Sequence, residues 1–295
     1  MLWRNDNTVV VGKYQNTREE INESYVKETG IKVVRRLSGG GAVYHDKGNL
    51  NFTFIVKDNS HGFDFNLFCI PIIKALAKFG ITASFNGRND ITIDGKKFSG
   101  NSQYASGGRL LHHGCIMLNS DLGKVENALK VKVIKFQSKS TKSIKSRVTT
   151  INANASNPIS MEDFKEALLQ ATGTSNTLIP YKLNKEELAE VKRLRNEKYV
   201  TWEWNYGKSP DYTSVCEKKY DSGVVSVLLK VSAGIIKDIK FYGDFFGNGD
   251  IEDLEDVIRG HKLSQNLLEV LRSQDVDYYI NGLTSQDIFE LLCGH

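Results

Sequence analysis

The chain has 295 residues, 39 of them Lys or Arg and 35 Asp or Glu, and its formal net charge at pH 7 is +4. At about 100 to 200 residues per domain, this length allows one large domain or two unequal ones. With 40% hydrophobic residues and 25 glycines, the composition excludes disorder and collagen. No apolar run approaches the roughly 18 residues that a membrane span needs, and Arg4 precedes any apolar stretch, so we expect no membrane segment, no secretory signal and a cytoplasmic location.

The four cysteines, Cys69, Cys115, Cys216 and Cys293, lie far apart and form no C-x-x-C pair. This spacing fits neither a disulfide framework nor a zinc knuckle. We therefore expect four reduced, mostly buried thiols.

The first half of the chain predicts strands and helices in alternation. Apolar runs and period-2 patterns favour strands at 8–12, 31–36, 51–56, 90–93, 96–98 and 110–118, and helical spacing favours a helix at 63–79. Asp94-Gly95 between two of these strands is typical of a type I′ hairpin. Thr17 to Glu20 has the spacing of a capping box, which predicts a helix that begins there and ends at Gly30.

The second half predicts helices at 160–170 and 185–197, and then changes in character. Apolar and aromatic residues alternate with polar ones over 200–206, which favours a strand. Two further strands, 224–231 and 235–241, form a predicted hairpin, and an acidic tail with helical periodicity follows Asn248. We infer an α+β protein with a first domain at 1–212 and a smaller α+β domain at 213–295.

The segment from Lys124 to Arg147 holds eight basic residues and one acidic residue. Such a block is typical of a solvated surface loop, of nucleic-acid binding or of an acidic protein partner. Phe136 is the only aromatic residue in it, whereas sequence-specific RNA recognition requires several to stack bases. We interpret the segment as a basic loop and expect no nucleic-acid partner.

The glycine-rich segment 35–46, RRLSGGGAVYHD, lies between two predicted strands. Consecutive glycines let backbone N–H groups approach an anion closely, and the two arginines before them are charged, planar donors that suit phosphate. The segment is not a P-loop, and no helix follows it as a Rossmann turn requires. A flexible hairpin is the alternative, but the flanking residues favour a phosphate site.

A second cluster surrounds the predicted Asp94-Gly95 hairpin, with Gly87-Arg88-Asn89-Asp90 before it and Lys97-Phe98-Ser99-Gly100-Asn101 after it. A carboxylate beside an amide suits Mg²⁺ carried on a nucleotide phosphate. A lysine on the neighbouring strand can place its charge where an acyl oxygen and a phosphate meet. A simple turn and an exposed lysine are the alternatives.

His112-His113-Gly114 lies in a predicted strand. Successive strand residues point to opposite faces, so the two histidines do not readily bind one metal ion. We expect a packed, hydrogen-bonded pair.

Taken in order, these motifs resemble lipoate-protein ligases of the LplA type. The resemblance rests on LWRN at 2–5, TVVVG at 8–12, the 35–46 segment, GRND at 87–90, KFSGN at 97–101, HHG at 112–114, SRVT at 146–149 and WEWNYG at 202–207. Residues 244–251, DFFGNGDI, resemble the family's C-terminal accessory domain. Each motif is weak alone, whereas the ordered set is specific.

The resemblance implies the fold shared by lipoate ligases, biotin ligases and octanoyltransferases, which has mixed β-sheets with flanking helices, plus the small C-terminal domain. Family members are expected to carry a strand and a helix before the LWRN motif. The implied reaction uses ATP to convert lipoate to lipoyl-AMP, and a lysine of an acceptor protein then displaces AMP. ATP and Mg²⁺ are the implied cofactors.

The resemblance also assigns roles to residues. Lys97 is the implied catalytic residue, since it matches the lysine that contacts both the lipoyl carbonyl and the phosphate, and Asp90 is the expected Mg²⁺ ligand. The lipoate-binding residues are expected to be Arg36, Gly41, Lys97 and His113. The residues expected to bind ATP or lipoyl-AMP are Arg35, Arg36, Ser38, Gly39, Gly40, Gly41, Ala42, Val43, Tyr44, Asn89, Lys97, Ser99, Gly100, His113 and Arg147.

The implied acceptors are the lipoyl domains of 2-oxoacid dehydrogenase E2 subunits and the glycine cleavage H protein. Three alternatives stay open at this point. An octanoyl or lipoyl transferase of the same fold needs an activated cysteine, and Cys115 and Cys69 lie in a predicted strand and helix and not in a site loop. A biotin ligase usually lacks the WEWNYG segment, and a non-catalytic lipoate-binding paralogue would bind lipoate without forming the adenylate.

Overall fold

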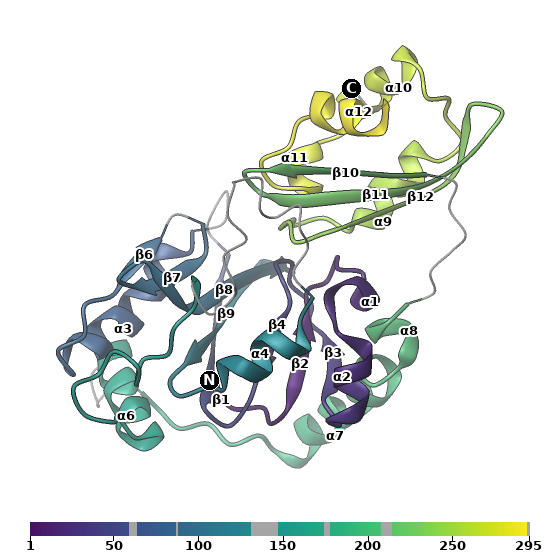
Figure 1. The fold of residues 1–295 in the computed structure, drawn as a ribbon. Helices are drawn as coiled ribbons and strands as arrows, with labels where there is room; N and C mark the ends of the chain where they lie inside the picture. Colours follow the sequence, from purple (N-terminus) through teal and green to yellow (C-terminus); the bar gives the residue numbers. More distant parts are fainter. Residues whose placement is uncertain (59–63, 87, 131–146, 174–177, 208–213, 294–295) are drawn as a thin grey trace.

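The computed structural model describes residues 1–58, 64–86, 88–130, 147–173, 178–207 and 214–293. Two parts lie one above the other in Figure 1, a larger one built from the first 207 residues and a smaller one that begins at β10. The larger part holds a six-stranded sheet and a three-stranded sheet, and the smaller part holds a second three-stranded sheet. This arrangement of mixed sheets with helices confirms the predicted α+β class.

The six-stranded sheet has the order β1-β5-β9-β8-β7-β6, and every neighbouring pair in it is antiparallel. Helices α3 (Asn66–Ala77) and α6 (Met161–Thr172) pack on each other and, with the sheet, enclose a core that includes Phe52, Phe98 and Phe164. The strands are β1 (Leu2–Trp3), β5 (Asn49–Lys57), β6 (Ser84–Asn86), β7 (Asp90–Ile93), β8 (Lys96–Ser106) and β9 (Arg109–Met117).

The three-stranded sheet of the larger part has β2 (Thr8–Val11) at its centre, parallel to β3 (Lys32–Arg35) and antiparallel to β4 (Val43–His45). All four residues of β2 are buried, as its β-branched run predicts for a central strand. Helices α1 (Thr17–Glu20), α2 (Glu23–Glu28) and α4 (Leu122–Ala128) lie beside this sheet (Figure 1).

The smaller part has its own core beneath the sheet β10-β11-β12. Tyr14 of the larger part packs into that core. The predicted boundary between residues 212 and 213 lies outside the described residues and stays a prediction. The elements are β10 (Ser214–Tyr220), β11 (Gly223–Ser232), β12 (Ile235–Gly243), α9 (Ile251–Ile258), α10 (Gln265–Arg272), α11 (Val276–Tyr279) and α12 (Ser285–Cys293).

The predicted strand over 200–206 was wrong. Helix α7 (Lys185–Leu194) continues into a π-helical turn η2 (Arg195–Tyr199), and α8 (Trp202–Asn205) follows. The Thr201 hydroxyl accepts a hydrogen bond from the Trp204 backbone N–H and caps α8. The Trp204 indole donates to the Arg35 carbonyl at 3.0 Å, so a tertiary contact overrides the local alternation.

The predicted capping box at Thr17 was also wrong, because the Thr17 hydroxyl donates to the Asn205 carbonyl at 2.6 Å. The chain there forms α1 and α2 in place of one helix, and Gly30 follows α2 with φ +64°, as its predicted role requires. The Asp94-Gly95 hairpin is confirmed, since both residues have positive φ, 49° and 73°.

The basic segment does not begin as a loop, because Lys124 lies in α4. Lys130 donates a hydrogen bond from Nζ to the Arg18 carbonyl at 3.1 Å. Residues 131–146, which carry five of the lysines, lie outside the described residues.

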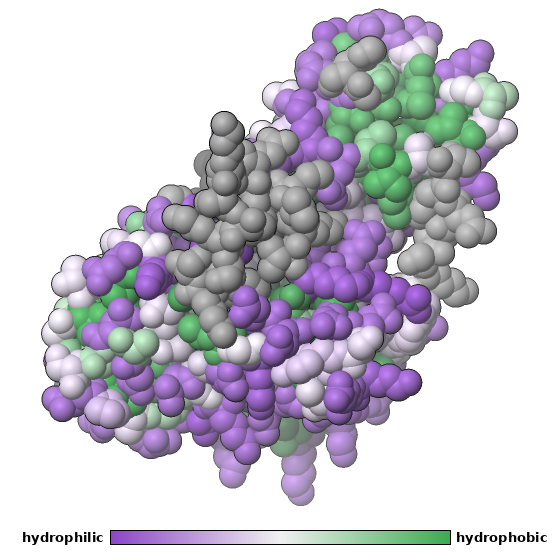
Figure 2. Space-filling model, viewed as in Figure 1, coloured by the Kyte–Doolittle hydropathy of each residue, from purple (hydrophilic) through white to green (hydrophobic). Residues whose placement is uncertain are grey.

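In the described part of the chain, no helix is both long enough and apolar enough to cross a membrane. Figure 2 shows hydrophilic residues over much of the larger part in this view and a patch of hydrophobic residues on the smaller part.

Candidate functional site

The glycine-rich loop that joins β3 to β4 is folded around the side chain of Arg36. The guanidinium donates to the carbonyl of Gly39 at 2.6 Å and to that of Gly41 at 2.9 Å. Gly40 between them has φ +88°, a conformation that favours glycine. Burial lowers the pKa of Arg36 to about 10, so its charge persists at neutral pH. The loop is therefore a fixed structure, not the flexible hairpin considered as the alternative.

The smaller part of the molecule packs directly on this loop. A Cβ on Gly39 would lie 2.1 Å from the Phe245 carbonyl oxygen, so only glycine fits there. The Gly40 N–H donates to the same oxygen at 3.3 Å. The rings of Tyr14 and Phe245 stack at 4.6 Å beside this contact.

His113 in strand β9 of the six-stranded sheet contacts the glycine-rich loop. Its Nε2 lies 2.6 Å from the Ser38 Oγ, and the Ser102 hydroxyl donates to the Gly39 carbonyl at 2.9 Å. Burial, helped by the nearby charge of Arg36, lowers the pKa of His113 to about 3, so the ring is neutral at pH 7. His112 instead pairs its Nδ1 with Gln103, so the two histidines do act separately, as predicted.

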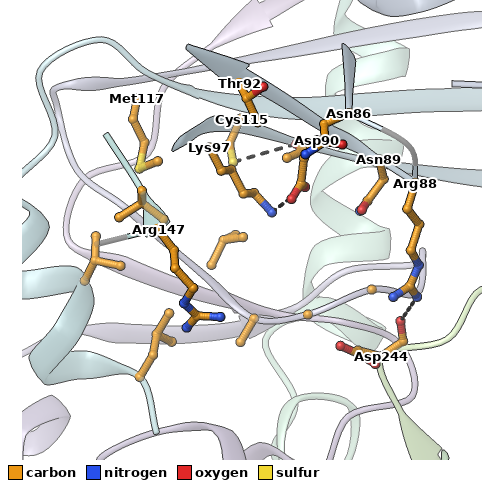
Figure 3. Close-up of a pocket in the computed structure, with 18 of the residues that line it drawn as sticks. Asn86, Arg88, Asn89, Asp90, Thr92, Lys97, Cys115, Met117, Arg147 and Asp244 are labelled. Atoms are coloured by element: carbon orange, nitrogen blue, oxygen red, sulfur yellow. Dashed lines mark hydrogen bonds and ion pairs between the residues drawn. The ribbon is translucent and has the colours of Figure 1, made fainter. Parts of the chain in front are cut away.

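Lys97 and Asp90 are brought together by an irregularity in the β7–β8 pairing. Asp90 lies opposite Gly100 and Thr92 lies opposite Lys97, and the pairing skips Phe98. Such a bulge re-aims side chains, and here Lys97 reaches the face of the sheet that carries Asp90. Lys97 Nζ lies 2.6 Å from Asp90 Oδ1, and Figure 3 shows the two side chains pointing at each other.

Gly100 provides the space for this ion pair. A Cβ at that position would lie 2.9 Å from both Cε and Nζ of Lys97. On the next strand Cys115 is paired with Gly100 and donates from Sγ to its carbonyl at 3.8 Å. The absence of a side chain at Gly100 thus leaves room for the Lys97–Asp90 pair beside the strand that carries Cys115.

These elements surround a cavity of about 450 Å³. Arg147 and Arg88 lie on either side of the Lys97–Asp90 pair in Figure 3. The cavity is lined by Gly40, Gly41, Ala42, Val43, Tyr44, Asn86, Arg88, Asn89, Asp90, Thr92, Gly95, Lys97, Gly100, Cys115, Met117, Val125, Leu129, Arg147, Val148, Asp244 and Phe246. Lysine and arginine outnumber the carboxylates among these residues, as suits a polyanionic ligand.

Asp244 and Phe246 bring the smaller part of the molecule into the cavity wall. Arg88 donates to the backbone carbonyls of Ser222 and Asp244, the latter at 2.9 Å, and its guanidinium lies 5.1 Å from the centre of the Phe246 ring. Burial lowers the pKa of Arg88. One arginine thus lines the cavity and joins the two parts.

The cavity contains most of the residues that the sequence assigned to ligands. The predicted residues that line it are Gly40, Gly41, Ala42, Val43, Tyr44, Asn89, Asp90, Lys97, Gly100 and Arg147. The glycine-rich loop, the β7–β8 hairpin and the SRVT motif therefore meet at one cavity, although they are separated along the chain.

Arg35 does not line this cavity. Its guanidinium donates to the carbonyls of Gly12, Lys13 and Gln15 at 2.6 to 3.0 Å, and also to Trp204 and Asn205. All these acceptors are backbone oxygens away from the cavity lining. Arg35 ties β3 to α1 and α8, and the ligand contact predicted for it stays a prediction.

Five other predicted residues do not line the cavity either: Arg36, Ser38, Gly39, Ser99 and His113. Ser99 is fully buried because side chains alternate along β8, which places it with Ile91 and Ile116 on the core face. The other four form the hydrogen-bonded support beneath the glycine loop. They position the loop, and the contacts predicted for them with ATP or lipoate stay predictions.

Sequence reasoning missed several lining residues. Cys115 faces the cavity although it lies in a strand and not in a loop, and Asp244 and Phe246 come from the predicted accessory domain. The alternation along β9 places Cys115 on the same face as His113, which is the one signal that pointed to it. Cys69 is buried in the core, which raises the pKa of its thiol to about 12. All four cysteines are free.

Residues 1–173 match the family described as the lipoyl protein ligase A/B catalytic domain, and residues 209–292 match the bacterial lipoate protein ligase C-terminus. Lipoate-protein ligase LplJ of Bacillus subtilis is 42% identical over 99% of this chain and 90% of its own length. Lipoate-protein ligase 1 of Staphylococcus aureus is 41% identical over 99% of this chain and 90% of its own length.

Solved structures agree with these matches. P. falciparum LipL1 in complex with lipoate superposes with a TM-score of 0.74 at 26% identity, over 100% of this chain and 86% of that one. A lipoate-protein ligase A bound with ATP superposes with a TM-score of 0.60 at 26% identity, over 70% of this chain and 84% of that one. The bipartite lipoate protein ligase of Thermoplasma acidophilum is described together with its E2 lipoyl domain. It superposes with a TM-score of 0.62 at 29% identity, over 72% of this chain and 85% of that one.

Proposed function

Because the chain belongs to the lipoate-protein ligase family and is an enzyme of that type, we propose that it catalyses two ATP-dependent half-reactions in the cavity described above. In the first, a carboxylate oxygen of lipoate attacks the α-phosphorus of ATP, the bond to the β-phosphate oxygen breaks, and pyrophosphate leaves. In the second, a lysine amine of the acceptor attacks the acyl carbon of lipoyl-AMP, an amide forms, and AMP leaves with the electron pair while the amine loses a proton.

The observation that carries this proposal is the convergence of Lys97, the glycine-loop backbone and Arg147 on one cavity. Both half-reactions pass through a centre where negative charge builds on oxygen atoms bound to phosphorus or carbon. Preorganised cations and backbone dipoles stabilise such charge without reorganising during the reaction. We assign to Lys97 the contact with both the acyl oxygen and the α-phosphate.

A magnesium ion fits the donors in the cavity only if it arrives with the nucleotide. Among the described residues, no group of three histidine, cysteine, aspartate or glutamate side chains is placed to hold a metal ion. Mg²⁺ is commonly held by one or two carboxylates together with substrate phosphates and water. Asp90 supplies one such carboxylate, beside the amide of Asn89. The ion would neutralise phosphate charge, and the protein would contribute Asp90 as its ligand.

We propose lipoyl domains of 2-oxoacid dehydrogenase E2 subunits and the glycine cleavage H protein as acceptors. The solved archaeal ligase is described with its E2 lipoyl domain, which supports the first of these. The acceptor lysine must reach Lys97 through the mouth of the cavity. The basic block that ends at Arg147 suits an acidic partner by its charge.

A cysteine-dependent acyl transferase is a second candidate, because Cys115 lines the cavity next to Gly100. Such an enzyme needs a base that activates the thiol. Both adjacent histidines are engaged elsewhere, His113 with Ser38 and His112 with Gln103. The geometry therefore favours the ligase.

Lipoate-dependent exchange of pyrophosphate into ATP tests the ligase directly, with transfer to an isolated lipoyl domain as the second assay. We expect exchange in the wild type and in Cys115→Ala. If exchange is absent while acyl groups pass between carrier proteins, and Cys115→Ala abolishes that passage, the transferase is correct and the ligase is wrong.

A further inference from the structure

Lys97, the lysine assigned to the acyl oxygen, is ion-paired in the structure as it stands. Lys97 Nζ lies 2.6 Å from Asp90 Oδ1, and the two side chains are 33% and 32% exposed. Within the described residues, Asp90 is the carboxylate in ion-pair contact with Lys97. The residue assigned to the acyl oxygen is therefore paired with the residue assigned to the metal.

A bound carboxylate substrate would feel both members of this pair. Lipoate carries its negative charge on the carboxylate that must approach Lys97. Asp90 beside the Lys97 ammonium cancels part of the attraction between that ammonium and the lipoate carboxylate. The carboxylates of Asp90 and lipoate also repel each other. The half-buried position makes the repulsion stronger than in bulk water.

Other cations of the cavity are differently placed. Arg88 has two of its donor contacts committed to the carbonyls of Ser222 and Asp244. Lys97 is one third exposed and lines the cavity, and Gly100 places no side chain against its Cε and Nζ. The lysine therefore has room to leave Asp90 without any backbone change.

We propose that Asp90 holds Lys97 in the empty enzyme, and that a divalent cation brought in on the nucleotide takes over the Asp90 carboxylate and releases Lys97 to the substrate carboxylate. This inference rests on the proposed function and deepens it. It makes the nucleotide and the acid bind cooperatively, and the coupling is reciprocal by thermodynamic necessity.

The test measures lipoate binding to the full chain by calorimetry, so its readout does not depend on turnover. In the wild type we expect Mg²⁺ with a non-hydrolysable ATP analogue to tighten lipoate binding about 3- to 10-fold, whereas the analogue with a chelator tightens it less. In Asp90→Asn we expect lipoate to bind about 3- to 10-fold tighter without any nucleotide, since the competing charge is gone.

Two matched controls isolate the charge effect. Asp94→Asn removes a carboxylate from the tip of the same hairpin, where asparagine tolerates the positive φ of 49°, and should change neither measurement. Lipoamide, the uncharged amide of the same acid, should bind Asp90→Asn and wild type equally. Equal lipoamide binding also shows that the variant is folded.

Unchanged or weaker nucleotide-free binding of lipoate to Asp90→Asn would overturn the inference, and so would an equal gain for lipoamide. Failure of the proposed function looks different, because then the wild type shows no lipoate-dependent pyrophosphate exchange at all. Exchange in the wild type together with no effect of Asp90→Asn on binding would reject the role of Asp90 and leave the ligase intact.

Discussion

Arg88 reaches out of the β6–β7 turn and donates to the Asp244 carbonyl at 2.9 Å, so that one guanidinium joins the catalytic sheet to the smaller part of the molecule. The same side chain contacts the Ser222 carbonyl and lies over the Phe246 ring. Because Arg88, Asp244 and Phe246 all line the cavity, the stability of this junction and the shape of the cavity depend on the same contacts.

Arg88→Ala should therefore weaken the junction between the two parts of the molecule and alter the cavity wall. We expect a loss of about 2 kcal/mol in the free energy of unfolding, since two charge-assisted hydrogen bonds disappear. The apparent KM for ATP should rise while the KM for the acceptor domain changes less. Urea unfolding and pyrophosphate exchange measure the two effects, with exposed Arg109→Ala as the matched control. An ATP KM equal to that of the control variant would show that the junction does not shape the nucleotide site.

Lys97→Ala tests the centre of the site. The cavity would lose the charge placed between acyl oxygen and phosphate, and adenylate formation should fall about 10²- to 10³-fold, as for loss of one preorganised donor. Lys96→Ala is the matched control, because that neighbouring lysine is exposed at the hairpin and does not line the cavity. Normal exchange in Lys97→Ala would remove the lysine from the mechanism.

Gly40 and Gly41 offer a matched pair inside the glycine loop. A Cβ on Gly40 would lie 3.0 Å from an Arg36 nitrogen and 3.2 Å from the Phe246 ring, and its φ is +88°, whereas a Cβ on Gly41 would meet no atom within 4 Å. We expect Gly40→Ala to cost about 1 to 3 kcal/mol of stability and Gly41→Ala to cost almost none. Thermal unfolding of both variants checks this, and equal costs would mean that the loop relaxes freely around either residue.

Local patterns predicted those parts of the fold in which one residue decides the backbone. Asp94-Gly95 is one example, because two positive φ values are needed and these residues adopt them cheaply. The segment around Trp204 is the opposite case. Its alternation favoured a strand, but the contact of its indole with the Arg35 carbonyl, 169 residues away, stabilises a helix.

The same limit applies to the candidate site. Arg35 and Arg36 are adjacent and chemically identical, and the sequence assigned both to phosphate. In the structure Arg35 donates to backbone carbonyls about 20 residues away, at Gly12 and Gln15, whereas Arg36 donates to the carbonyls of Gly39 and Gly41 in its own loop; no local pattern reveals this difference. Cys115 was set aside because it lies in a strand, yet the missing side chain at Gly100 on the next strand opens the cavity toward it.

The stability of the protein should fall on mild acidification because of His113. Burial holds the folded pKa of His113 at about 3, below the ordinary value of about 6.5 in the unfolded chain. The unfolded state therefore binds more protons below about pH 6.5, and stability drops by up to about 1.4 kcal/mol per pH unit between there and the folded pKa. Above pH 6.5 His113 contributes no pH dependence to the free energy of unfolding.

His113→Gln, which keeps a donor near Ser38, should flatten that slope, and exposed His261→Asn should not. Urea unfolding of the three proteins from pH 5 to pH 8 measures the slope. His45 and His112 also have pKa values lowered to about 3 by burial, so part of the slope should survive in His113→Gln. A slope identical to that of the wild type would mean that His113 does not become protonated on unfolding.

The last prediction concerns how the acceptor reaches the site. Lys132, Lys135 and Lys139 belong to the basic block and match no nucleotide motif, whereas Lys130 donates to the Arg18 carbonyl and is left unchanged. Replacing the three with Gln should raise the apparent KM for an acidic lipoyl domain without changing pyrophosphate exchange. Because a Debye length of about 10 Å at 0.1 M salt screens long-range attraction, the defect should shrink as salt is added. A salt-independent defect, or an equal loss of exchange, would assign these lysines to the adenylate and not to the acceptor.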